Sequence, residues 1–81
     1  MERDVTQILS AATDSVTLIN GVNDGSWNVE GMEQSEINDM VQRNVEHLEI
    51  ILAYEEVVAD SSDKSSYNSA ISTGKAYIAA H

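Results

Sequence analysis

Two histidines and a set of carboxylates carry the side-chain chemistry that catalysis or metal binding could use. His47 lies in "NVEHLEI" between Glu46 and Glu49, and His81 is the last residue of the sequence. A stable zinc site needs three or four converging ligands, and general acid–base catalysis needs a group with a tuned pKa beside a pocket. His47 and its neighbours supply only part of a ligand set, and neither histidine has the spacing of a catalytic triad. We expect His47 to be a half-exposed residue at the edge of a helix face.

The glycine-rich and acidic segments do not match the loops that bind phosphate or calcium. Gly21, Gly25 and Gly31 fit neither the Walker A nor the dinucleotide-binding spacing. The segments "NDGSWNVEGMEQ" and "DSSDKSSY" carry acidic and amide oxygens without the register of a calcium-binding loop. The chain has no cysteine, which excludes disulfides and thiolate metal sites. We therefore expect a non-enzymatic protein with no catalytic residue, no cofactor and no metal site.

The chain is strongly acidic, with fourteen Asp and Glu against four Lys and Arg and a formal net charge of −10. Binding to a phosphate backbone needs clustered basic residues, and these are scattered at positions 3, 43, 64 and 75. No apolar run approaches the roughly 18 residues of a membrane span, and "MERDVTQ" lacks the apolar segment of a signal peptide. We expect protein partners, with no direct binding of nucleic acid, membrane or small-molecule substrate. Synthesis in a cytosol is the default expectation, and a protein that is later incorporated into a larger particle would have the same features.

The apolar residues recur at helical spacing and predict an all-α fold. Length predicts a single domain over residues 1–81, with helices at about 3–20, 35–59 and 63–80. After the first helix, Asn20-Gly21 predicts a stop, because glycine tolerates the left-handed conformation that ends many helices. A strand between Ser15 and Val22 is the alternative, since this stretch is rich in β-branched residues.

The linker over 21–34 is long enough to run the length of a short helix, so it leaves the order and handedness of the bundle open. The connection between the second and third predicted helices is short and predicts an antiparallel hairpin. Together the elements predict a small three-helix bundle. Trp27, the one tryptophan, lies in the linker segment "NDGSWNVEG". It is interpreted either as an anchor folded over the end of the bundle or as a residue that faces a partner.

The 35–59 helix carries two apolar stripes. Ser35 is its predicted N-cap, and Asn44 and Glu55 fall near its main apolar face. That face comprises Ile37, Met40, Val41, Val45, Leu48, Ile51, Leu52 and Ala59. A second stripe lies roughly opposite and comprises Ile50, Tyr54 and Val57. It is interpreted either as a surface sandwiched between the other two helices or as an interface to another chain.

The 63–80 helix has three candidate N-caps and a small-residue position in its apolar stripe. Asp60, Ser61 or Ser62 can each accept a hydrogen bond from the first turn. Gly74 lies in the middle of the stripe, where it costs about 1 kcal/mol relative to alanine. With Ala70 one turn earlier, Gly74 predicts the close approach of another helix backbone.

The segments "RNVEHLEIILA" (43–53) and "YNSAISTGKAYIAAH" (67–81) resemble small, mostly uncharacterised helical proteins encoded by tailed bacteriophages, particularly those of marine and cyanobacterial hosts. The resemblance covers residues 43–81 and brings no catalytic motif, so no residue role follows from it. It implies a phage context, in which small non-enzymatic proteins are virion components or host-interaction factors, and with it a location in a virion or the host cytoplasm.

Two functional hypotheses follow. The first is a structural accessory of a phage head or tail that docks through apolar helix faces onto itself or other virion proteins, as part of an oligomer. Its predicted interface residues are Trp27, Ile50, Tyr54 and Val57. The second is a small acidic inhibitor, or mimic of nucleic acid, that occupies a basic site on a host protein.

Overall fold

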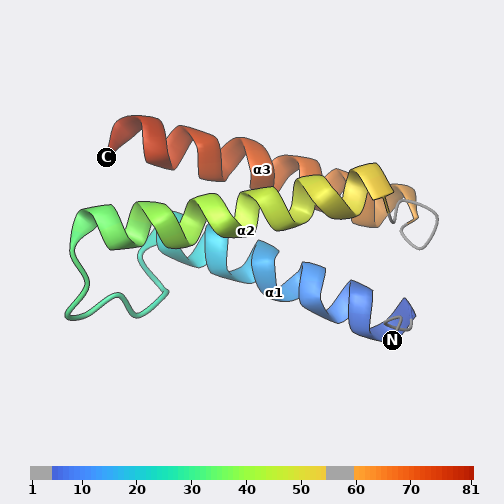
Figure 1. Cartoon of the computed structure of the whole chain (residues 1–81), viewed down its shortest axis with the longest axis horizontal. Coiled ribbons are helices and arrows are strands. Elements are labelled where there is room, and N and C mark those ends of the chain that lie inside the picture. Colours follow the sequence, from blue (N-terminus) through green and yellow to red (C-terminus); the bar gives the residue numbers. More distant parts are fainter. Residues whose placement is uncertain (1–4, 55–59) are drawn as a thin grey trace.

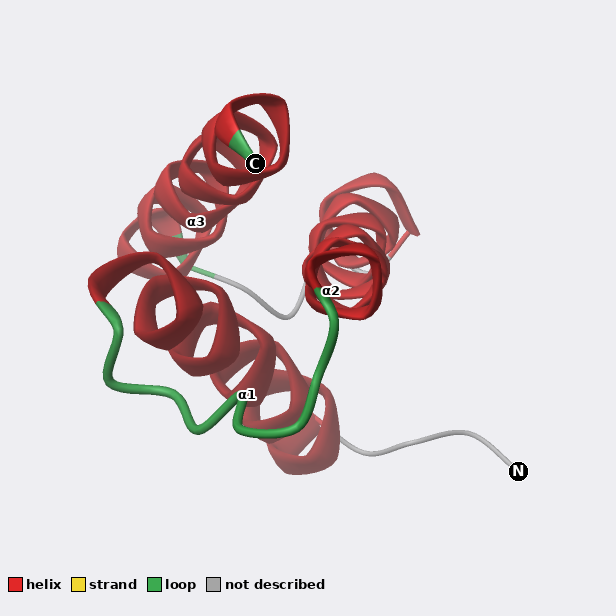
Figure 2. Ribbon diagram, turned by 90° about the vertical axis from the view of Figure 1, so that its left-hand side faces the viewer, coloured by secondary structure: helices red, strands yellow, loops and turns green. Residues whose placement is uncertain are grey.

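A computed structural model describes residues 5–54 and 60–81, apart from the side chain of Tyr54. Over these residues the chain forms three α-helices, namely α1 (Val5–Asp24), α2 (Gln34–Tyr54) and α3 (Ser61–Ala80). Both α1 and α3 run antiparallel to α2 (Figure 1), and the three occupy the corners of a triangle when seen along the bundle (Figure 2). The predicted all-α three-helix bundle with an antiparallel α2–α3 hairpin is confirmed.

All three helices contribute to one apolar core. Its largest fully buried side chains are those of Ile19, Val41, Val45, Leu48 and Ile51. Each such side chain contributes about 1.5–3 kcal/mol through removal from water. The chain has no phenylalanine, so aliphatic packing carries most of this core.

Gly74 lets α3 approach the other two helices closely. A Cβ atom at this position would overlap with Val45 and would lie 3.3 Å from Cγ2 of Ile19 and from Cγ1 of Val41. Ala70, one turn earlier, is fully buried. The sequence predicted the close approach of another helix backbone, whereas the atoms nearest to Gly74 belong to side chains of α1 and α2.

The first helix is longer than the sequence predicts. It continues through Gly21, which is buried and helical, and ends at Asp24. Gly25, with a φ of 85°, makes the left-handed turn that had been assigned to Gly21. The linker therefore covers residues 25–33 rather than 21–34, and it joins the adjacent ends of α1 and α2 (Figure 1). The alternative of a strand within residues 15–22 is wrong, because these residues form the second half of α1.

The N-termini of α2 and α3 also differ from the prediction. Ser35 lies inside α2 and is not its cap. The carboxylate of Glu36 instead accepts a hydrogen bond from the backbone N–H of Glu33 at 3.0 Å, and this contact stabilises the start of α2. In α3, Asp60 is the N-cap among the three candidates. It forms a reciprocal capping box with Asp63, which starts the helix at Ser61 rather than at residue 63.

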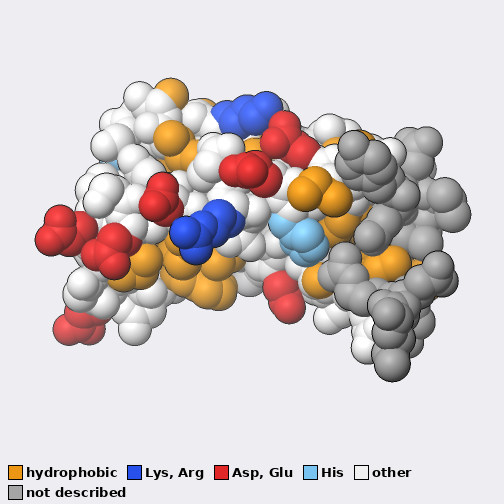
Figure 3. All heavy atoms as spheres, viewed as in Figure 1, with side chains coloured by type: hydrophobic (Ala, Val, Ile, Leu, Met, Phe, Trp, Pro, Cys, Tyr) orange, Lys and Arg blue, Asp and Glu red, His pale blue; other side chains and the backbone are white. Residues whose placement is uncertain are grey.

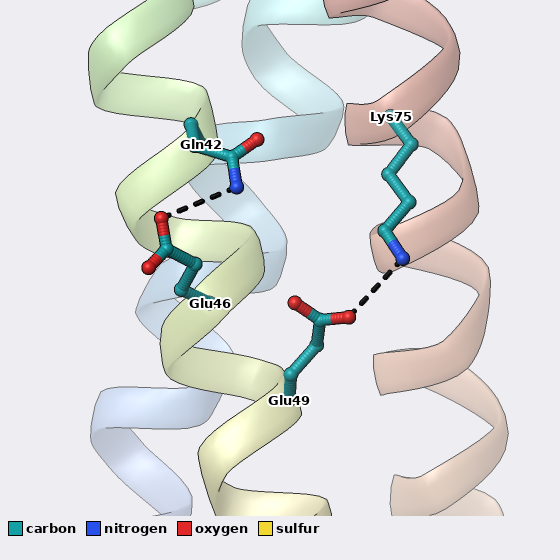
Figure 4. A network of polar contacts seen from close by, with 4 residues as sticks. All are labelled: Gln42, Glu46, Glu49 and Lys75. Carbon is teal, nitrogen blue, oxygen red and sulfur yellow. Dashed lines mark hydrogen bonds and ion pairs between the residues drawn. The ribbon is translucent and has the colours of Figure 1, made fainter.

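An ion pair joins the polar outer surfaces of α2 and α3. Lys75 Nζ lies 3.1 Å from Glu49 Oε2, and Gln42 donates a hydrogen bond to Glu46 on the same side of α2 at 3.2 Å (Figure 4). Both members of the ion pair are largely exposed, so it contributes less than about 1 kcal/mol. No helix in the described part of the chain combines the length and apolar character needed to cross a bilayer. The predicted end of the second helix at residue 59 lies outside the described residues.

Candidate functional site

A buried serine links α1 to α2 through side-chain hydrogen bonds. Ser15 Oγ lies 2.9 Å from Oδ1 of Asn44 and 2.8 Å from Nδ1 of His47. The side chain of Asn44 in turn donates from Nδ2 to the backbone carbonyl of Met40 at 2.8 Å. Ser15 is only 3% exposed, and Asn44 and His47 are half-buried. The hydroxyl therefore sits inside the helix interface with its polar partners around it.

The direction of these hydrogen bonds decides what Ser15 can do. Because the Asn44 amide nitrogen donates to Met40, its carbonyl oxygen faces Ser15 and accepts the single hydroxyl proton. His47 Nδ1 then carries a proton and donates to the serine oxygen. Activation of a serine nucleophile requires the opposite direction, with the imidazole accepting the hydroxyl proton. This cluster is a polar tie between two helices.

His47 was predicted to be a half-exposed residue at the edge of a helix face, and this is confirmed. Its contact with Ser15 was not predicted. A signal for it exists in the sequence, because Ser15 falls between Ala12 and Ile19 on the buried stripe of α1. A polar side chain on such a stripe requires a partner, and Asn44 had already been placed near the main apolar face of α2.

A groove opens on the surface beside this cluster. It has a volume of about 550 Å³ and is lined by Met32, Glu36, Asp39, Met40, Arg43 and Asn44. Met32 comes from the linker and the other lining residues from α2, and both methionines pack against the core. Acidic side chains border apolar surface at the end of the molecule where α2 begins (Figure 3). The groove thus combines two flexible apolar side chains with an acidic rim.

One side of α2 connects the groove to an exposed isoleucine. Glu36, Met40, Arg43, His47 and Ile50 follow one another at spacings of four, three, four and three residues, which places them along one side of a helix. We call this set the α2 flank. Ile50 is 52% exposed. The interpretation that Ile50 is sandwiched between the other helices is therefore wrong, and it lies on the surface of the bundle.

Trp27 folds back onto the end of α1. Its backbone N–H donates to the carbonyl of Gly21 at 3.0 Å, and its side chain covers that glycine. The residue is still 37% exposed. Trp27 is thus an anchor of the linker that keeps part of its surface open.

The predicted interface residues do not gather at one place. Trp27 lies in the linker before α2, whereas Ile50 lies sixteen residues after Gln34, about 24 Å along the helix axis. The side chain of Tyr54, and Val57 and Glu55 as a whole, lie outside the described residues. The groove at Met32 and Met40 was not predicted, because its shape depends on how the linker packs beside α2.

No group of three or more potential metal ligands converges within residues 5–54 and 60–81. Comparisons of the chain with protein-family models, with curated proteins and with solved structures found no match.

Proposed function

We propose that this protein is a non-enzymatic interaction module that docks onto other proteins through the α2 flank. The proposed setting is the particle of a tailed bacteriophage, in which the chain is an accessory or assembly component of the head or tail. The observation that carries the proposal is the exposure of Ile50. It is a large aliphatic side chain on the outside of a helix whose main apolar face already packs in the core.

The surroundings of Ile50 suit a protein interface. Interfaces place a few apolar anchors within a polar rim, and those anchors supply most of the binding energy. On the α2 flank, Ile50 follows the half-buried His47, and Met40 of the groove lies about three turns towards the start of α2. Trp27, also partly exposed, offers a second apolar contact from the linker.

A photo-crosslinking experiment in phage-producing cells tests this function. A photoreactive amino acid replaces Ile50 in one variant and Val5 in the control variant. Val5 lies on α1, and 50% of it is exposed. Purified particles are then analysed by peptide mass spectrometry. We expect the chain in the particles, with crosslinks to a virion protein from position 50 and far fewer from position 5. Absence from particles, together with no crosslinked protein from position 50, contradicts the proposal.

A second candidate function is an acidic inhibitor that competes with nucleic acid for a basic site on a host protein. It is favoured by the run of acidic residues around the linker, where no Lys or Arg interrupts positions 24–39. These acidic residues are Asp24, Glu30, Glu33, Glu36 and Asp39. Such binding weakens steeply as salt rises. Two results together support this candidate over the first. The chain inhibits a host nucleic-acid enzyme and salt relieves that inhibition, and the chain is absent from purified particles.

A further inference from the structure

We propose that the α2 flank and its groove bind a cationic amphipathic helix of a partner protein. This inference rests on the proposed function and names the class of partner. The surface consists of the flank residues defined above together with Met32 and Asp39, which line the groove beside them.

The apolar part of the surface has two separated anchoring points. Met32 and Met40 line the groove, and methionine adapts its shape to different apolar partners. Ile50 lies ten residues beyond Met40, about 15 Å along the axis of α2. An apolar side chain of a partner can enter the groove while another, about three turns away, covers Ile50.

The straight course of the flank along α2 suits a helical partner. Met40 and Ile50 lie on the same side of α2, so a second helix that lies along this side can contact both of them. A partner helix of about 15 residues spans the flank from Glu36 to Ile50.

The charge of the chain selects a cationic partner. Glu36 and Asp39 line the groove, and Glu46 lies next to His47 on α2. Arg43 is the one Lys or Arg between positions 4 and 63, so the carboxylates of Glu36 and Asp39 outnumber the Lys and Arg side chains on this surface. A second copy of the chain would bring another −10 of formal charge against the first. Lysines and arginines flanking the apolar anchors of a different protein instead meet the rim with complementary charge.

Titration with designed peptides tests the partner class on the full chain. The probe is an amphipathic helical peptide of leucine and lysine of about 15 residues. One control peptide keeps the lysines and replaces leucine by glutamine, and a second keeps leucine and replaces lysine by glutamate. Binding is followed by ¹H–¹⁵N NMR at fixed salt, which reports both affinity and location.

Two matched pairs of variants locate the surface. Ile50→Gln is compared with Val5→Gln, since the two side chains are 52% and 50% exposed. Asp39→Asn is compared with Glu49→Gln, since each removes one negative charge from α2 while Glu49 faces Lys75 of α3 (Figure 4). Circular dichroism confirms that each variant remains helical.

We expect the leucine–lysine peptide to bind about ten-fold more tightly than either control peptide, with shifted resonances along the flank. Ile50→Gln weakens that binding about ten-fold and Asp39→Asn about three-fold, whereas Val5→Gln and Glu49→Gln change it less than about two-fold. Equal binding of the lysine–glutamine peptide, or equal effects within each pair of variants, overturns the proposal. If the leucine–lysine peptide fails to bind while position 50 still crosslinks to a virion protein, the partner class is wrong and the proposed function stands.

Discussion

The side chain of Trp27 lies on Gly21, six residues earlier in the chain. The N–H of Trp27 donates to the Gly21 carbonyl at 3.0 Å, and a Cβ added to Gly21 would lie 3.2 Å from the Trp27 Cβ and 3.4 Å from Cε3. Gly25, with a φ of 85°, turns the chain so that this contact can form. The two glycines therefore have different tasks, one in packing and one in backbone conformation.

Replacing Gly21 by leucine should displace Trp27. The larger side chain occupies the space of the indole, so part of the apolar surface that Trp27 now buries returns to water. We expect the tryptophan emission to shift to longer wavelength and the free energy of unfolding to fall by about 1–2 kcal/mol, after the better helix propensity of leucine is counted. Asn20→Leu, at the exposed neighbouring position, should leave the emission unchanged. An unaltered spectrum in Gly21→Leu contradicts this packing.

Replacing Gly74 by alanine should destabilise the bundle even though alanine favours helices. The added methyl overlaps with Val45 and crowds Ile19, and overpacking a core costs about 1–3 kcal/mol. The helix-propensity gain returns at most about 1 kcal/mol. We expect a net loss of about 1–2 kcal/mol in urea unfolding. Adding Val45→Ala to Gly74→Ala should cost less than the sum of the two single changes, because the smaller side chain makes room for the methyl. Additive losses would show that the two positions are not in contact.

The helices themselves could be predicted from the sequence, because their apolar spacing is local information. The sequence also indicated a packing reason for Gly74, since a glycine in a buried stripe is costly, but it did not show that side chains rather than a backbone lie over it. The end of α1 was predicted wrongly, since Gly21 and Gly25 both satisfy the local rule for a helix stop. Only the contact between Gly21 and Trp27, made through the linker, decides between them.

The candidate site was less predictable than the fold. The stripe that contains Ile50 is visible in the sequence, but its exposure depends on where α1 and α3 pack around α2. Ser15 was missed because its partners Asn44 and His47 lie 29 and 32 residues away. A serine on the face of an isolated helix has no such partners, and the requirement for them arises only when the helix is buried.

Removal of the Ser15 hydroxyl should weaken the contact between α1 and α2. Ser15→Ala removes the hydrogen bonds that the Ser15 hydroxyl forms with the half-buried side chains of Asn44 and His47, at a cost of about 1–3 kcal/mol. Chemical denaturation measures the loss, and Ser10→Ala, at an exposed position of α1, should change stability by less than about 0.5 kcal/mol. In a double-mutant cycle, Ser15→Ala and Asn44→Ala should together cost less than their sum. Equal stabilities of Ser15→Ala and Ser10→Ala are incompatible with the polar tie.

Stability at alkaline pH should depend on Tyr67. Burial raises the pKa of the Tyr67 phenol above its ordinary value of about 10, and the negative charges of Asp63 and Asp60 raise it further. Since the folded-state pKa is higher than the unfolded one, the unfolded chain releases this proton first as pH rises. The contribution of Tyr67 is therefore complete below about pH 10 and is lost as pH rises from there through the folded-state pKa.

The Tyr67→Phe variant isolates this effect. Phenylalanine has no phenolic proton, so the alkaline loss due to residue 67 should disappear, and the difference in unfolding free energy between wild type and variant should change as pH rises above about 10. Tyr77→Phe is the matched control on α3, where the hydroxyl accepts a hydrogen bond from Gln34 at 3.0 Å. It should keep the alkaline loss due to Tyr67. If wild type and Tyr67→Phe lose stability in parallel across this range, the ionisation of Tyr67 is not coupled to folding.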